Sequence, residues 1–363
     1  MPAAQILALL QEFESRNVTF IDPDGSWPIV WKRARGMHVW DANEKKYLDL
    51  TAAFGVAAAG HTNPRVVRAA QTQMETLLHA MGDVHPHALK AALARELSRI
   101  TFERWSEPFE VPNAKFQRSA NAPLRGKTIF CNSGFEAVEA ALKTALLTTG
   151  KRGVVAFESG YHGLGYGALT TTHREHFRTR FRAQLSDFAS FMPFPESEDA
   201  LAAMERKLRR VCRSQEIGAI LVEPVQGRGG IRIPPPSFLG VLRRVCDDYG
   251  ALLIADEVLT GFGRTGCWFA CEHSKVIPDV ICLGKALTGG FPLSACVGRA
   301  EVMDRGWPAA TGEAIHTSTF LGHPVGCAMA LAQIAEIRNK RLVEAARHKG
   351  ELFLNLLRQV NPP

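Results

Sequence analysis

The sequence lacks the features of several large classes of protein. Among its 363 residues, no apolar run approaches the length of a membrane span, and no internal repeat or low-complexity tract is evident. The formal net charge of +7 is modest for this length, and the basic segments 173–182 and 206–213 have few interleaved aromatic residues. We read both as solvated faces, so neither a nucleic acid nor a membrane is an expected partner.

Cysteine pairs and metal-ligand clusters are also lacking. The eight cysteines are scattered without a CxxC pair, and several, such as Cys282 and Cys296, lie inside apolar runs. We interpret them as reduced, buried thiols of a cytoplasmic protein. The closest pair, Cys267 and Cys271, lacks the spacing and the second pair of a zinc site, and residues 85–87 (HPH) have no partner cluster. No metal site is predicted.

What is present favours a large α/β chain. The apolar fraction is 46% and supports a sizeable core. Strand-like apolar runs alternate with helix-like ones through Thr128–Val297, which predicts a mostly parallel sheet flanked by helices. The first seventeen residues lack a basic leader, and Gln11-Glu12 interrupts their apolar run. They predict an amphipathic helix and not a signal peptide.

Two apolar runs are followed by charged residues at their carboxyl ends. One run ends in Asp256-Glu257, and the run Val280–Leu283 is followed by Gly284-Lys285. Open α/β sheets place their chemistry just beyond the carboxyl ends of strands. An acid that holds a pyridine nitrogen protonated and an amine that forms a Schiff base are what a pyridoxal-phosphate site needs. Taken alone, either feature is more often a nucleotide-binding strand end or a solvated loop lysine.

A phosphate site is expected at the start of a helix. The strand-like run Thr128–Cys131 leads through Asn132 to Ser133-Gly134 and then to FEAVEAALKTALLTT, whose apolar positions recur at helical spacing. Free amide groups and the helix dipole there favour a phosphate. The alternative is a plain Ser N-cap with early glutamates. The order of strand, Ser-Gly, helix, aromatic-His, Asp and Lys along the chain favours the phosphate interpretation.

Two glycine-bounded segments supply further candidates. Tyr161-His162 stands between Gly160 and Gly163, where an aromatic ring suits stacking on a flat ring, although such turns also occur as structural loops. The early segment WDANEKKYLDLTAAFGVAAAGHTNP predicts two short strands and a glycine-rich turn before a helix at Pro64.

With these motifs in this order, the chain from about Gly36 to about Ala335 resembles the class III, fold-type I, pyridoxal-phosphate aminotransferases, the group of acetylornithine, ornithine and 4-aminobutyrate aminotransferases. The resemblance implies that Lys285 is the Schiff-base lysine and Asp256 the partner of the pyridine nitrogen. It implies that Val258 and Tyr161 pack on the two faces of the cofactor ring, with His162 beside Tyr161. It places Glu223 (in VEPVQG) near the cofactor ring and Thr319 (in STFLGHP) at the phosphate of the partner subunit's cofactor. It also places Phe54 and Val56 at the substrate entrance.

The resemblance also implies a domain division and a homodimer. Residues 1–70 would contribute to the small domain and the active-site entrance, residues 71–330 would form the large cofactor-binding domain, and residues 331–363 would begin the C-terminal small domain. The pattern KRLVEAARHKGELFLNLLRQV predicts a helix, and the family's later glycine-rich segment and substrate-binding arginine have no counterpart before Pro363. We therefore expect an incomplete small domain with uncovered apolar surface.

Three residues depart from the family pattern. Arg228 (in VEPVQGRGG) stands where several ω-amino enzymes have a glutamate, Leu259 stands where many have a glutamine, and His323 replaces an asparagine before Pro324. We hypothesise that Arg228 receives a substrate carboxylate; the alternative is a surface loop arginine. The expected reaction is transamination from an amine or ω-amino acid to a 2-oxo acid such as 2-oxoglutarate. An aminomutase or racemase on the same fold, or a non-catalytic remnant, is the alternative.

Overall fold

The computed structural model describes residues 1–106 and 124–360. A seven-stranded sheet forms the larger body, in the order β4-β10-β9-β8-β7-β5-β6. Strands β5 to β9 pair in parallel, whereas β10 runs antiparallel to both β4 and β9. Its strands are β4 (Gly126–Cys131), β5 (Gly153–Phe157), β6 (Ala189–Met192), β7 (Ile217–Val222), β8 (Leu252–Asp256), β9 (Val280–Leu283) and β10 (Ser294–Arg299).

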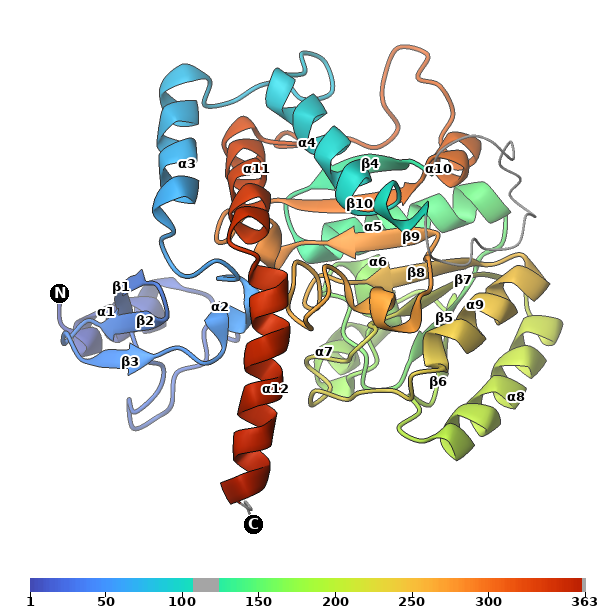
Figure 1. Ribbon diagram of the computed structural model, residues 1–363, viewed down its shortest axis with the longest axis horizontal. Coiled ribbons are helices and arrows are strands. Elements are labelled where there is room, and N and C mark those ends of the chain that lie inside the picture. Colours follow the sequence, from blue (N-terminus) through green and yellow to red (C-terminus); the bar gives the residue numbers. More distant parts are fainter. Residues whose placement is uncertain (107–123, 361–363) are drawn as a thin grey trace.

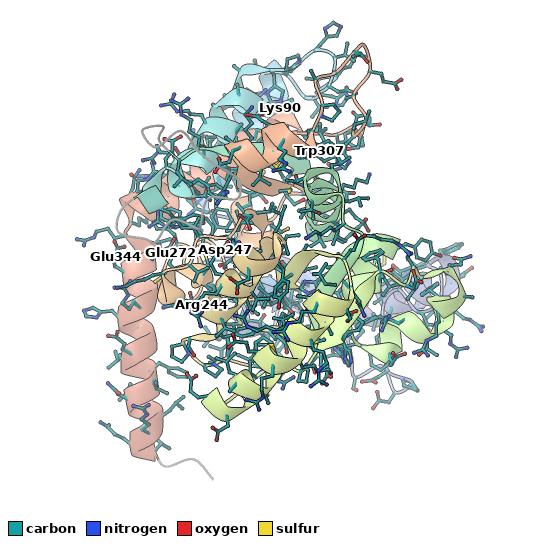
Figure 2. The ribbon with its side chains drawn as sticks, turned by 90° about the vertical axis from the view of Figure 1, so that its right-hand side faces the viewer. Lys90, Arg244, Asp247, Glu272, Trp307 and Glu344 are labelled. Carbon is teal, nitrogen blue, oxygen red and sulfur yellow. The ribbon has the colours of Figure 1, made fainter. Side chains whose placement is uncertain are left out.

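Helices cover both faces of this sheet, as the sequence predicts (Figure 1). Because successive strand residues point to opposite faces, Leu252 and Ile254 join the core beneath α5 (Gly134–Thr149), while Leu253 joins the core on the opposite face. That second core includes residues of α8 (Glu198–Ser214) and α9 (Phe238–Tyr249), and Figure 2 shows Arg244 and Asp247 on α9.

The remaining helices surround this body. Trp307, which follows α10 (Ala300–Gly306) and is labelled in Figure 2, donates its indole N–H to Thr144 Oγ of α5 at 3.0 Å. Helix α11 packs on both α3 and α4. The helices not yet given are α3 (Pro64–Thr76), α4 (Ala88–Ile100), α6 (Tyr166–Thr171), α7 (Glu175–Arg178) and α11 (Pro324–Asn339), with short 3-10 turns at Arg104–Ser106, Thr179–Gln184, Ala270–Ser274 and Lys285–Leu287.

The N-terminal residues form a separate small layer. Helix α1 (Ala3–Phe13) confirms the predicted amphipathic helix, and β1 (Trp31–Arg35), β2 (His38–Asp41) and β3 (Lys46–Leu48) pair as an antiparallel sheet. The turn labelled α2 (Ala52–Gly55) leads toward α3 and lies between this sheet and the larger body (Figure 1). This confirms the two short strands, the turn and the helix beginning at Pro64.

The last helix, α12 (Leu342–Val360), confirms the helix predicted from the sequence pattern. It extends away from the larger body (Figure 1), and only Val343 of its side chains is buried. Its exposed apolar residues are Leu352, Phe353, Leu354, Leu356, Leu357 and Val360. No helix within residues 1–106 and 124–360 is long and apolar enough to cross a membrane.

Candidate active site at the carboxyl edge of the large sheet

Asp256 and Lys285 lie at neighbouring strand ends, where the sequence places them. Asp256 is the last residue of β8 and pairs in register with Cys282 of β9. Lys285 lies two residues beyond the end of β9. A methyl group added to Gly284 would lie 3.3 Å from Val258 Cγ1 and 3.7 Å from Gly134 Cα. The end of β9, the residue after Asp256-Glu257 and the start of α5 therefore meet at one point.

Asp256 is held by hydrogen bonds in a buried position. It is 5% exposed; its Oδ2 lies 2.8 Å from His162 Nδ1, and its Oδ1 accepts the Val258 amide N–H at 3.1 Å. Burial acts to lower the pKa of His162, but Asp256 and Glu223 outweigh it, and the pKa of His162 is raised. The raised pKa favours His162 as a donor to Asp256, and this contact fixes the position of the carboxyl group.

Lys285 combines an unusual backbone with a perturbed amine. Its φ is +40°, a left-handed conformation that is uncommon for a residue with a Cβ and that clusters at functional sites. Burial lowers the pKa of the Lys285 amine, and Arg228 acts in the same direction, while Asp256 and Glu223 oppose them. The net effect makes the neutral, nucleophilic amine more accessible near neutral pH than in a solvated lysine.

Glu223 is a buried carboxyl beside this pair. Its Oε2 accepts the Tyr161 amide N–H at 2.9 Å, and its Oε1 accepts the Gly227 amide N–H at 3.1 Å. Burial raises the pKa of Glu223 to about 7, with Asp256 adding to the rise and His162 opposing it. Glu223 therefore exchanges a proton in the physiological range, as a group that assists proton transfer must.

The start of α5 has the features of an anion site. Ser133 is the N-cap of this 16-residue helix, and Glu136 accepts the backbone N–H groups of Asn132 and Ser133, at 2.6 and 3.3 Å. Ser133 and Glu136 form a capping box in which the Ser133 side chain faces the Glu136 backbone N–H, but within the described part of the chain the buried Ser133 Oγ makes no hydrogen bond of normal geometry. A methyl group added to Gly134 would lie 2.9 Å from Val258 Cγ1, so this position leaves no room for a side chain. An unpaired hydroxyl at a helix N-terminus fits a phosphate.

The Tyr161 ring lies in a cationic and aromatic corner. Its centroid is 5.5 Å from that of Phe177, and the Arg228 guanidinium carbon lies 4.7 Å from the Tyr161 centroid and 5.2 Å from the Phe177 centroid. Arg228 is exposed but positioned by these rings, which orient a guanidinium without neutralising it. It therefore remains available to a carboxylate.

The other predicted residues lie at the rim or apart from it. Phe54 is 80% exposed, Val56 is half-buried and Thr319 is exposed. Ser318, next to Thr319, has its Oγ 3.4 Å from Asn132 Nδ2. The side chain of Leu259 fills the space between Gly55 and Gly227, because a methyl group on either glycine would lie within 3.1 Å of its terminal carbons. Leu259 thus joins the N-terminal turn to the Glu223–Gly227 loop.

Two features of this site escape sequence reasoning. The first is the contact of His162 with Asp256, since the pattern suggested only that His162 stands beside Tyr161. The second is Phe177, which lies in the basic segment that the sequence suggested was a solvated face. The signal available in the sequence was Phe177 itself, which stands between Arg174 and Arg178. In the structure, the guanidinium carbon of Arg174 lies 5.4 Å from the centroid of the Phe177 ring, and that of Arg178 lies 5.0 Å from the centroid of the Phe191 ring. Residues 1–106 and 124–360 hold no cluster of three or more His, Cys, Asp or Glu suited to a metal ion.

Comparison with known proteins agrees with this geometry. The family described as aminotransferase class-III matches residues 21–362. An acetylornithine aminotransferase of Methanosarcina acetivorans is 37% identical over 334 residues, which cover 92% of this chain and 74% of that protein. One of Methanopyrus kandleri is 37% identical over 331 residues, covering 91% and 76%.

Solved structures give the same result. An ornithine aminotransferase from Toxoplasma gondii superposes with a TM-score of 0.80 at 27% identity, covering 98% of this chain and 76% of that one. A thermostable (S)-enantioselective ω-transaminase from Thermomicrobium roseum gives a TM-score of 0.86 at 27% identity, covering 99% and 80%. These findings confirm the predicted resemblance, the α/β fold class and the transaminase activity. The chain belongs to the class III aminotransferases.

Proposed function

We propose that this aminotransferase moves an amino group from an ω-amino acid of the ornithine, acetylornithine or 4-aminobutyrate type to a 2-oxo acid, with 2-oxoglutarate as the acceptor. We also propose that it uses pyridoxal 5'-phosphate held at the carboxyl edge of the large sheet. The observation that carries the proposal is the convergence of Lys285, the Asp256–His162 pair and the unpaired Ser133 hydroxyl at one point. The curated relatives of this chain are named acetylornithine aminotransferases.

The residues present fit this cofactor. Ser133 Oγ and the first amides of α5 would hold the phosphate, Asp256 would pair with the ring nitrogen, and Tyr161 and Val258 would border the ring. When bound, the cofactor supplies an aldehyde for an amine and a ring that withdraws electrons from the carbon that loses its proton. Asp256, oriented by His162, would hold the protonated nitrogen of the cofactor ring. Lys285 Nζ carries a proton to and from the reacting carbon, and its lowered pKa suits this task.

Phe54 and Val56 would line the entrance, and Arg228 would receive the second carboxylate of the acceptor. A planar guanidinium binds a carboxylate through two parallel hydrogen bonds, and the Tyr161 and Phe177 rings fix its orientation. Thr319, exposed in one subunit, would reach the phosphate site of a partner subunit in a homodimer. The buried thiols, seven of the eight cysteines, support a cytoplasmic location.

Steady-state assays with paired donors and acceptors test this proposal. We expect wild-type protein loaded with pyridoxal phosphate to transaminate ω-amino donors with 2-oxoglutarate and to show no turnover without an acceptor. Product formation from a donor alone would instead indicate an aminomutase or racemase.

Arg228→Met tests the acceptor site, with the exposed Arg206→Met of α8 as the control. Because a hydrogen bond to a charged group contributes about 1.5–3 kcal/mol, we expect the KM for 2-oxoglutarate to rise roughly 10–100-fold. The KM for pyruvate, which has one carboxylate, should change little. An unchanged KM for 2-oxoglutarate would assign Arg228 to the surface.

A further inference from the structure

The turn that joins the small sheet to α3 has an unfavourable backbone. Ala52, Ala53 and Phe54 have φ values of 48°, 50° and 54°, and Gly55 follows at 86°. Left-handed conformations cost free energy for every residue that carries a Cβ, and such residues normally occur singly. A run of three, with only the fourth position a glycine, needs support from outside the turn.

Asp49 and His61 supply that support. Asp49 Oδ1 accepts the Thr51 amide and hydroxyl at 2.9 and 2.7 Å, and Asp49 Oδ2 accepts the Ala53 amide at 2.8 Å. His61 Nε2 lies 2.7 Å from the same Oδ2, and its side chain and that of Asp49 are only 12% and 6% exposed. We call these two residues the Asp49–His61 brace.

The brace is anchored in the small sheet. The His61 backbone exchanges two hydrogen bonds with Gly36, between β1 and β2, at 3.0 and 2.8 Å. Burial raises the pKa of Asp49, but hydrogen bonds from Thr51, His61 and Ala53 outweigh it and bring the pKa to about 2. The Asp49 carboxylate is therefore ionised at every pH at which the enzyme would work.

The braced turn reaches the catalytic edge. A methyl group added to Gly55 would lie 3.1 Å from Leu259 Cδ1, and Leu259 stands three residues beyond Asp256. On its other side the same Leu259 side chain packs against Gly227, next to Arg228. Phe54, beside Gly55, keeps its apolar ring 80% exposed at this rim instead of burying it. Figure 1 shows the turn between the small sheet and the larger body.

We propose that Asp49 and His61 are positioning residues for donor specificity: by holding the left-handed turn Ala52–Gly55 they keep Phe54 at the rim, where its ring contacts the methylene chain of an ω-amino donor. This inference rests on the proposed transaminase function and specifies how its donor site discriminates. Donors with a long methylene chain depend on the brace, whereas a short donor such as alanine does not.

Asp49→Asn tests the proposal, with Asp24→Asn as the matched control because Asp24 is exposed and also accepts a local backbone N–H, from Ser26. We expect the KM for 4-aminobutyrate and ornithine to rise about tenfold, by analogy with the loss of one hydrogen bond to a charged group. The KM for alanine and kcat with saturating alanine should stay within twofold. An equal loss with every donor, or none, overturns the proposal.

A rescue experiment separates positioning of the turn from general stability. In the Ala52→Gly/Ala53→Gly background the left-handed backbone stays unfavourable at Phe54 alone, so Asp49→Asn should raise the KM for 4-aminobutyrate only about threefold or less. The same tenfold rise in both backgrounds would show that Asp49 does not act through the turn. If Asp49→Asn does not fold, Phe54→Ala, a change at an exposed side chain, must reproduce the donor-selective rise in KM, and an unchanged KM there overturns the proposal.

These outcomes differ from a failure of the proposed function. If wild-type protein transaminates ω-amino donors but all donors respond equally to the variants, the function stands and the brace proposal falls. If wild-type protein transaminates no donor, the proposed function fails before any variant is compared.

Discussion

The carboxyl edge of the large sheet and the Ala52–Gly55 turn meet at Leu259 but are built in opposite ways. Asp256 is 5% exposed and ends a fully buried strand, whereas Phe54 is 80% exposed and lies in a turn with a left-handed backbone. The groups proposed to move or hold protons are thus fixed in a buried frame, which is where a pKa can be shifted. The residue expected to contact the variable part of the substrate is carried by a braced loop.

The largest effect on kcat is expected from loss of the Lys285 amine. Lys285→Ala removes the nucleophile and the proton carrier together, and general acid–base catalysis alone contributes roughly 10²–10⁴-fold. We expect kcat to fall by at least about 10⁴-fold, measured with ω-amino donors and 2-oxoglutarate. Lys207→Ala, a change at an exposed lysine on α8, is the control. Transamination within tenfold of wild type in Lys285→Ala would refute the assignment.

Asp256→Asn should lower kcat less than Lys285→Ala does, and His162→Asn should lower it less than Asp256→Asn. Loss of one preorganised charged partner typically lowers kcat about 10²–10³-fold, which we expect for Asp256→Asn. His162→Asn leaves the carboxylate but removes its partner at 2.8 Å, so a fall of roughly tenfold is expected. The exposed His348→Asn is the control. A larger loss from His162→Asn than from Asp256→Asn would reverse the roles of the two residues.

The last effect concerns the pH dependence of stability at Glu223, and not turnover. Its pKa is raised by burial from 4.5 to about 7, so the folded chain binds this proton more tightly than the unfolded chain. The resulting stabilisation is fully present below pH 4.5 and is lost as the pH rises to about 7. Relative to Glu223→Gln, the wild-type free energy of unfolding should fall by roughly 3 kcal/mol across this range.

Urea denaturation at pH 5 and pH 7.5 measures this difference, with Glu12→Gln, a change at an exposed residue of α1, as the control. A difference between wild type and Glu223→Gln that is the same at both pH values would mean that Glu223 is ionised throughout.

The same contrast explains what the sequence could predict. Strands β8 and β9 and helix α5 are encoded locally, because an apolar run ends at Asp256, another ends before Gly284, and Ser133 precedes a helical pattern. The position of the proposed site at the carboxyl edge of the sheet then follows from the rule for strand ends.

The contacts between distant segments could not be predicted in this way. His162 reaches Asp256 across 94 positions, and Phe177 reaches Tyr161 from a segment dominated by arginines. The left-handed turn is also hidden, because that backbone is unfavourable for alanine and phenylalanine; hydrogen bonds of Asp49 with Ala53 and His61 support it.

The visible absorption spectrum of the purified chain with pyridoxal phosphate tests the central claim most directly. We predict an absorption band that Lys285→Ala lacks, that disappears when an ω-amino donor is added and that returns with 2-oxoglutarate. A band that is the same in wild type and Lys285→Ala and responds to neither substrate would contradict the assignment of Lys285 and its partners as a working transaminase site.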